Sequence, residues 1–379
     1  MSNEELNIFK YANQLQKLPA RYNQLEGEKI SRKIKQIGSK LGDNLVLLGH
    51  NYQSAKVLSF CEHSGDSYKL AKIASSMKEA TYIIFCGVTF MAESADILTS
   101  DNQQVIVPAL EAACPMAGMA ELVQVEGAWR ELGEFFDLAN VTPITYMNSY
   151  ADLKAFCGRN NGAVCTSSNA TKLFEWALAE GERIFFFPDE HLGRNTAREL
   201  GMGEDEIAVW NPWAENRGGL SEEELSSARI ILWAGNCQVH QRFKPEDVRK
   251  IKNQVPEVTV MVHPECRRAV VKKADRAGST GQIIEAVENA PPGSNWAIGT
   301  ETNLISHLEE KHPDKQIYHL GEPARNTCYA MAQITPAHLL WMLESIEAGE
   351  AKNVISVDSK ISEQALKALD KMIKITEGT

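Results

Sequence analysis

The sequence lacks the features that would place it in several common protein classes. No stretch approaches about 18 consecutive apolar residues, so no segment is predicted to cross a bilayer. Residues 1–17 are polar and partly acidic and contain no apolar core of a secretory leader. The chain has 39 basic and 50 acidic residues, a net charge of −11, which disfavours unspecific nucleic-acid binding. We therefore expect a cytoplasmic protein that binds neither membrane nor nucleic acid.

Cysteine is present, but in none of the patterns typical of disulfide scaffolds or zinc ribbons. The 379-residue chain has eight cysteines without a C-x-x-C pair, and it is too long for a disulfide-stapled mini-domain. In the cytosol such cysteines stay reduced, and most reduced cysteines are small buried hydrophobic residues. Cys61, Cys86, Cys157 and Cys165 are predicted to be core residues of this kind.

Short apolar runs, each followed by a turn and a helical stretch, recur along most of the chain. This alternation indicates an α/β protein with mostly parallel sheets. Helices are predicted up to about residue 40 and again, as an amphipathic closing helix, over 362–373. The predicted strands are 45–49, 82–87, 105–108, 144–148, 162–166, 183–188, 229–235, 258–263, 296–300 and 316–321, with a weaker one at 275–280.

A series of landmarks repeats three times along the chain. First a polar residue ends a strand, at His50, Asn148 and His263. A small hydroxyl residue follows 17, 19 and 17 residues later, and a cysteine follows 64, 89 and 65 residues after the first landmark. The hydroxyl residues are Ser67, Ser167 and Thr280, and the cysteines are Cys114, Cys237 and Cys328.

The repeat predicts three related α/β units, each with a sheet of about four strands. Their ranges are 1–140, 141–256 and 257–379. The middle repeat is about 24 residues longer than the others, and the segment 201–220 is predicted to be the insertion. If three such units pack around one axis, equivalent loops meet at the centre, because ligands bind at the carboxyl ends of parallel strands.

The three equivalent cysteines are then candidates to converge on a metal. Three thiolates in a reducing compartment suit a soft metal centre such as a 4Fe–4S cluster, which normally takes four cysteines. Three ligands leave one iron open, and an open iron is a Lewis acid that helps a hydroxyl group depart. The alternative is that these cysteines are buried and structural like the others.

The side chains near the strand ends favour a small anionic substrate. His50 and Tyr52 follow one strand, Tyr146 and Asn148 share one face of another, and 263–265 supplies an imidazole and a carboxylate. Residues 166–169 and 278–281 precede helical runs, whose amino ends favour carboxylates or phosphates. Each feature taken alone is also explained by an ordinary helix cap or a hydrogen-bonded histidine. The segment 188–195 either binds metal or substrate or braces two units.

Twelve short stretches across nearly the whole chain resemble the quinolinate synthase A family, in its longer branch with an insertion in the middle domain. They are 50–53, 65–71, 85–95, 114–117, 145–149, 165–170, 186–195, 233–240, 263–266, 278–280, 298–304 and 328–336. The resemblance implies three αβα domains in pseudo-threefold arrangement around a central active site with a 4Fe–4S cluster. It also implies that iminosuccinate and dihydroxyacetone phosphate condense to quinolinate, phosphate and water in NAD biosynthesis. Functional coupling with L-aspartate oxidase follows from the same resemblance.

The resemblance assigns roles to individual residues. The cluster ligands would be Cys114, Cys237 and Cys328, and the residues that move protons would be Tyr52, Glu265, His50 and His263. The positions that would bind iminosuccinate are His50, Ser67, Tyr146, Met147, Asn148, Ser167, His263, Pro264, Glu265 and Thr280. Some family members carry a C-x-x-C-x-x-C run at the third ligand, but this chain has only Cys328 there, so no redox switch of that type is expected.

Two other functions are compatible with the same residues. One is a different iron–sulfur hydro-lyase that acts on another small dicarboxylate. The other is a cluster-based redox or iron sensor without catalysis. Quinolinate formed from the two named precursors would separate the first alternative from the family function, and a protein or nucleic-acid contact surface would favour the second.

Overall fold

The structure is a computed structural model that describes residues 11 and 17–378. The described chain forms two compact units. Unit 1 comprises Met1–Cys114 and Thr327–Asp358, and unit 2 comprises Pro115–Asn326 and Ser359–Thr379. Unit 1 contains one sheet and unit 2 contains two. None of the helices in the described residues is both long enough and apolar enough to cross a membrane.

The sheet of unit 1 has five strands in the order β14-β4-β3-β1-β2. Neighbouring strands pair in parallel except β14, which runs antiparallel to β4. Its strands are β1 (Leu45–His50), β2 (His63–Gly65), β3 (Tyr82–Cys86), β4 (Gln104–Ile106) and β14 (Val354–Ile355).

Unit 2 contains the second and third sheets, in which every strand pairing is parallel. The second sheet has the order β6-β5-β7-β9-β8, and the third has the order β11-β10-β12-β13. The second consists of β5 (Val141–Tyr146), β6 (Ala163–Cys165), β7 (Arg183–Phe187), β8 (Ile207–Trp210) and β9 (Ile230–Trp233). The third consists of β10 (Thr259–Val262), β11 (Arg276–Ala277), β12 (Asn295–Gly299) and β13 (Gln316–His319).

All three sheets share one strand order, which confirms the predicted α/β fold of related units. In each sheet the second strand of the repeat lies beside the first, and the third and fourth follow on the other side of the first. The third sheet has the four strands expected, whereas the other two have one additional edge strand each. The added strand of the second sheet, β8, lies inside the predicted insertion 201–220. The strands β1–β4, β5–β9 and β10–β13 fall within the three predicted ranges, but the boundaries near 141 and 257 stay predictions.

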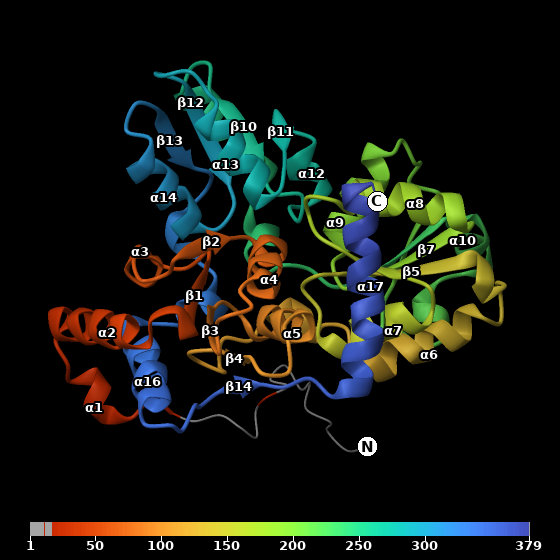
Figure 1. The fold of residues 1–379 in the computed structure, drawn as a ribbon. Helices are drawn as coiled ribbons and strands as arrows, with labels where there is room; N and C mark the ends of the chain where they lie inside the picture. The colour runs from red at the N-terminus through yellow and green to blue at the C-terminus, as the bar shows by residue number, and fades with distance from the viewer. Residues whose placement is uncertain (1–10, 12–16, 379) are drawn as a thin grey trace. The chain divides into compact units, whose positions relative to one another are not determined.

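The helices connect and cover the strands (Figure 1). Those of unit 1 are α1 (Ala20–Asn23), α2 (Gly27–Leu41), α3 (Ala55–Leu58), α4 (Ser67–Ser76), α5 (Thr89–Leu98), α15 (Tyr329–Ala332) and α16 (Pro336–Glu347). Those of unit 2 are α6 (Leu122–Leu132), α7 (Ala151–Arg159), α8 (Ala170–Glu180), α9 (Glu190–Glu199), α10 (Glu222–Ser227), α11 (Pro245–Gln254), α12 (Arg268–Val271), α13 (Thr280–Glu288), α14 (Thr302–Lys311) and α17 (Ser359–Glu377). The helices predicted near the two ends of the chain are confirmed by α1, α2 and α17. The part of the first prediction that falls on residues 1–10 and 12–16 lies outside the described residues.

The central strands of the sheets are buried because helices cover both faces of a parallel sheet. All six residues of β5 and all four of β9 are buried. In unit 2 the rings of Trp129 and Phe156 lie 5.6 Å apart, and those of Phe185 and Trp233 lie 6.2 Å apart. Burying each such side chain contributes roughly 1.5–3 kcal/mol. Helix α17 packs along α7 and closes this unit (Figure 1).

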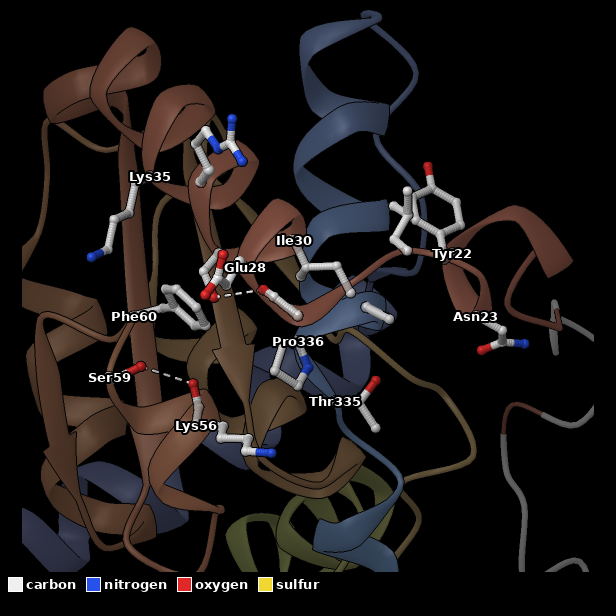
Figure 2. Close-up of a pocket in the computed structure, with 15 residues that line it drawn as sticks. Tyr22, Asn23, Glu28, Ile30, Lys35, Lys56, Ser59, Phe60, Thr335 and Pro336 are labelled. Atoms are coloured by element: carbon white, nitrogen blue, oxygen red, sulfur yellow. Dashed lines mark hydrogen bonds between the residues drawn. The ribbon is translucent and has the colours of Figure 1, made fainter.

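A surface cavity of about 830 Å³ opens in unit 1 between α2, α3 and the start of α16. Figure 2 shows Glu28 near its middle, with Phe60 and Pro336 on its wall. None of the residues that the sequence predicts for catalysis, substrate or metal lines this cavity. The predicted histidines lie instead at the strand ends, His50 at the end of β1 and His263 directly after β10.

Candidate functional site

The first landmark of each repeat lies at the carboxyl end of the first strand of its sheet. His50 is the last residue of β1, His263 directly follows β10, and Asn148 lies two residues beyond β5. In each sheet the neighbours of this strand lead away in opposite directions, so these residues lie at the topological switch point. Open α/β sheets bind their ligands at this point.

Two of these strand ends have the same local hydrogen bonding although they belong to different units. Nδ1 of His50 accepts a hydrogen bond from the backbone N–H of Tyr52 at 3.1 Å. Nδ1 of His263 accepts one from the backbone N–H of Glu265 at 3.3 Å. Because Nδ1 is the acceptor, the proton of each neutral imidazole lies on Nε2. The two strand ends of the repeat therefore hold their histidines in the same local geometry.

The predicted hydroxyl residues follow the second strand of each sheet. Ser67 is the first residue of α4, and Thr280 is the first residue of α13. The residue before each of them, Asp66 or Ser279, caps the helix by accepting a hydrogen bond from a backbone N–H of its first turn. Such amino ends leave backbone N–H groups for a ligand. Ser167 differs, because it lies in the turn that precedes α8, three residues ahead of the helix.

Unit 2 brings Glu265 together with two histidines and a tyrosine. Oε2 of Glu265 lies 2.5 Å from Nδ1 of His240 and 3.4 Å from Nδ1 of His263. The two imidazole rings are stacked with centroids 4.3 Å apart, and the hydroxyl of Tyr146 donates a hydrogen bond to the Glu265 carboxylate. His240, His263 and Glu265 are all buried. The structure thus brings three of the predicted residues, Tyr146, His263 and Glu265, together.

The carboxylate of Glu265 is held in its ionised form. Burial by itself would raise its pKa, but the neighbouring His263 and His240 and the hydrogen bonds from His240 and Tyr146 outweigh it. The pKa of Glu265 is lowered to about 2. A general base works best with a pKa near the operating pH, so this carboxylate is better suited to stabilising an adjacent imidazolium than to removing a proton from substrate itself.

The lowered pKa of Glu265 predicts a pH dependence of stability. A carboxyl group whose pKa is lower in the folded state stabilises the fold above its unfolded pKa of about 4.3, and this contribution is lost as the pH falls toward the folded value. We expect the difference in unfolding free energy between the wild type and Glu265→Gln to shrink as the pH falls from about pH 5 to pH 2. Urea unfolding of both proteins across this range measures it. A difference that grows as the pH falls would contradict the assignment.

Two residues of this site, His240 and Asp189, have no individual role in the prediction from the sequence, although Asp189 lies within the segment 188–195. His240 begins the short helical turn η6 (His240–Arg242) three residues after Cys237, and this C-x-x-H spacing was a usable signal. Asp189 is the N-cap of α9, where its Oδ1 accepts from the backbone N–H of Leu192 at 2.6 Å. Its Oδ2 accepts from the backbone N–H of Cys237 at 3.1 Å. Burial, and then the charge of Glu265, raise the pKa of Asp189.

The backbone before Cys237 presses against the start of α9. The backbone N–H of Glu190 donates to the carbonyl oxygen of Gly235 at 2.8 Å. A Cβ at Gly235 would lie 2.3 Å from the carbonyl oxygen of Pro188, so only glycine permits this approach. Together with Asp189, this contact fixes the position of the Cys237 loop within unit 2.

Exposure divides the eight cysteines in a way that fits the predicted ligands. The thiols of Cys86, Cys157, Cys165 and Cys266 are buried, and their pKa values are raised, in the last three chiefly by burial. The three predicted ligands are partly exposed, and each directly precedes a turn of helix or lies three residues before one. These are Cys114 before η3 (Pro115–Gly118), Cys237 before η6 and Cys328 before α15. Partly exposed thiols ionise more readily than buried ones, as metal binding requires.

Cys61 is the exception among the cysteines predicted to be core residues. It is partly exposed, so that prediction is wrong, and its thiol donates a weak hydrogen bond to the carbonyl oxygen of Val57 at 3.5 Å. The donor set of Cys114, Cys237 and Cys328 fits an iron–sulfur cluster by its chemistry. Cys114 and Cys328 belong to unit 1 and Cys237 to unit 2, and their convergence stays a prediction.

The segment 188–195 is a brace rather than the loop that the sequence suggested. Most of it forms the start of α9, and the Asn195 amide nitrogen donates to the carbonyl oxygens of Pro264 and Cys266, each at 2.8 Å. These two bonds fix the backbone on both sides of Glu265. The segment therefore braces the middle repeat against the third within unit 2, which was one of the two roles predicted for it.

Replacing Asn195 by alanine is expected to loosen this brace. Two carbonyl oxygens lose their donor, at a cost of roughly 1–3 kcal/mol for each group left unsatisfied. The melting temperature should fall by several degrees, at about 2–4 °C for each kcal/mol. Asn102→Ala is the matched control, because Asn102 is exposed. Equal melting temperatures of the two variants would show that the brace contributes nothing.

The fold and these residues define an α/β protein with acid–base groups at its strand ends and a partly exposed cysteine beside them. The profile of the family described as quinolinate synthetase A protein (NadA) matches residues 32–374. The chain belongs to this family. It is 49% identical to a protein named quinolinate synthase from Haloarcula marismortui over 371 residues, 98% of either chain. A protein of the same name from Bacillus cereus is 46% identical over 357 residues, 94% of this chain and 96% of that one.

Proposed function

We propose that this protein is a quinolinate synthase that condenses iminosuccinate with dihydroxyacetone phosphate to give quinolinate, phosphate and water. The family match and the names of the relatives support this activity. The structural observation that carries it is the Glu265 carboxylate held between two imidazoles, with Cys237 close by. The Cys237 thiol and ligand atoms of His240 and Glu265 all lie within 4.8 Å of one another. Groups that move protons and a predicted cluster ligand therefore occupy the same place.

The two carboxylates of iminosuccinate would be held by hydroxyl groups and helix amino ends. In unit 2 these are Thr280 at the start of α13 and Ser167 before α8, and in unit 1 Ser67 at the start of α4. Such positions offer backbone N–H groups and the positive end of the helix dipole. The predicted contacts of Met147, Asn148 and Pro264 with the substrate belong to this proposal.

The imidazoles are the groups that move protons in this account. His50 and His263 each have Nδ1 engaged with a backbone N–H, so Nε2 carries a proton and can offer it to the substrate as a hydrogen-bond donor. The ionised Glu265 stabilises an imidazolium that forms on His240, whose Nδ1 lies 2.5 Å from its Oε2. Tyr52, whose ring lies edge-on to His50 with centroids 4.7 Å apart, serves as a further acid or base.

Cys114, Cys237 and Cys328 would hold a 4Fe–4S cluster. When bound, a cluster with one open iron supplies a Lewis acid that assists the departure of a hydroxyl group as water. Asp189 and Gly235 keep the Cys237 loop in place for this role. A cytoplasmic location, three structural units at the predicted boundaries and coupling with L-aspartate oxidase as the source of iminosuccinate complete the proposal.

The activity is tested with anaerobically purified protein after iron and sulfide have been counted. L-aspartate oxidase supplies iminosuccinate in the same vessel, dihydroxyacetone phosphate is added, and quinolinate and phosphate are measured. We expect equal amounts of the two products. Full cluster content without quinolinate would overturn the proposal and favour a different hydro-lyase or a sensor.

A further inference from the structure

Three different metal-binding side chains meet within unit 2. The Sγ atom of Cys237 and ligand atoms of His240 and Glu265 all lie within 4.8 Å of one another. Cys237 lies in the loop after β9, His240 begins the turn η6 that follows this loop, and Glu265 lies in the loop after β10. Of these three residues, only Cys237 is a predicted ligand of the 4Fe–4S cluster.

The surroundings of these side chains resemble a metal site. Nε2 of His240 lies 3.0 Å from the hydroxyl oxygen of the buried Thr300, which directs the other ring nitrogen, Nδ1, toward Glu265. The backbone N–H of Cys237 is fixed by Asp189. A metal-binding histidine typically has its second nitrogen held by such a partner, which sets the ring orientation.

Sulfur, imidazole nitrogen and carboxylate oxygen are the three donor types that Zn²⁺ takes in proteins. Bonds of about 2.0–2.3 Å in tetrahedral geometry place such donors roughly 3.3–3.7 Å apart. The 2.5 Å contact between His240 and Glu265 has to open by about 1 Å, and the Cys237 thiol has to approach. His240 and Glu265 are buried, while Cys237 is partly exposed and leaves an entry path and a position for water.

We propose that Cys237, His240 and Glu265 form a mononuclear Zn²⁺ site in the protein that carries no cluster. On binding, the thiol loses its proton, and Zn²⁺ replaces the short contact between the imidazole and the carboxylate, so protons are released to solvent. The site uses one thiolate of the predicted cluster. Bound Zn²⁺ and a complete cluster therefore exclude each other, a consequence that rests on the proposed function.

Titration of the full-length, cluster-free protein with Co²⁺ tests the site directly, because Co²⁺ substitutes for Zn²⁺ and is coloured. We expect one Co²⁺ per chain, with a sulfur-to-cobalt absorption band and the visible bands of a tetrahedral site. Zn²⁺ should displace the Co²⁺. Cys237→Ser should remove the sulfur band, and His240→Gln and Glu265→Gln should each weaken binding by more than about tenfold.

Cys114→Ser and Cys328→Ser are the matched controls, and both should bind Co²⁺ like the wild type. Loss of binding in these two variants would overturn the inference, since it would indicate a site made of three cysteines. Full binding in His240→Gln would overturn it as well. Thr300→Val keeps all three ligands and nearly the same volume, so it serves if the ligand variants do not fold. It should weaken Co²⁺ binding by about 10–100-fold while the sulfur band remains.

The prediction that bound Zn²⁺ and a complete cluster exclude each other is tested by adding one equivalent of Zn²⁺ before the cluster is rebuilt from iron and sulfide. We expect less bound iron than without Zn²⁺, and full recovery once a chelator has removed the Zn²⁺. Equal iron content with and without Zn²⁺ would refute the exclusion. If the Co²⁺ pattern holds but no quinolinate forms, the metal site stands and the proposed function fails, so the two outcomes can be told apart.

Discussion

Glu265→Gln is expected to lower kcat by about 10²–10⁴-fold while the cluster stays in place, the range of a lost acid–base contribution. Glutamine keeps the shape of the side chain but removes the negative charge that lies 2.5 Å from His240 and 3.4 Å from His263. An imidazolium that forms during turnover then has no counter-charge. Steady-state quinolinate formation measures the effect, and iron and sulfide counts verify the cluster.

Glu344→Gln is the matched control for this substitution. Glu344 is an ion-paired carboxylate in unit 1, 2.6 Å from Lys33 and hydrogen-bonded to Tyr22, and it takes no part in the proposed chemistry. Its kcat should stay near the wild-type value. A wild-type kcat in Glu265→Gln, at equal cluster content, would refute the role assigned to Glu265.

Cys328→Ser is expected to remove the cluster and, with it, all measurable quinolinate formation. A serine oxygen is a poor ligand for iron–sulfur clusters, which take thiolates. The visible absorption of the reconstituted protein should fall, together with its iron and sulfide content. Cys114→Ser and Cys237→Ser should behave in the same way.

Cys266→Ala separates ligand loss from general damage. This thiol lies directly after Glu265 in sequence, but it is buried, and burial raises its pKa. Its removal should leave the iron content unchanged. If Cys266→Ala lost as much iron as Cys328→Ser, the assignment of the three ligands would be wrong.

The sequence predicted the fold well where strands are buried on both faces. Runs such as β3 and β9 are continuous and apolar, so hydrophobicity alone finds them. It missed β2 and β14 because they have only three and two residues, and in β2 only the glycine is buried. These short strands form through pairing with a longer neighbour, which a local pattern does not contain.

Only part of the site could be predicted, again because some of its residues depend on contacts with distant parts of the sequence. His50, His263 and Glu265 lie at or within three residues of the ends of strong strands, so their place at a sheet edge can be read from the sequence. His240 and Asp189 acquire their roles only through contacts across 25 and 48 residues of sequence, with Glu265 and Cys237. Ser167 was matched to Ser67 and Thr280 by spacing and by the family resemblance. The structure places it in the turn before α8, as predicted for residues 166–169, whereas Ser67 and Thr280 each begin a helix.

The central claim, that a condensation joins two named precursors, is tested most directly with dihydroxyacetone phosphate labelled with ¹³C at every carbon. The protein carrying its cluster is incubated with this substrate and unlabelled iminosuccinate, and the mass of the quinolinate is measured. Condensation of the two precursors predicts quinolinate that contains all the labelled carbons of the triose. Quinolinate without label, or no quinolinate from protein with a full cluster, would contradict it.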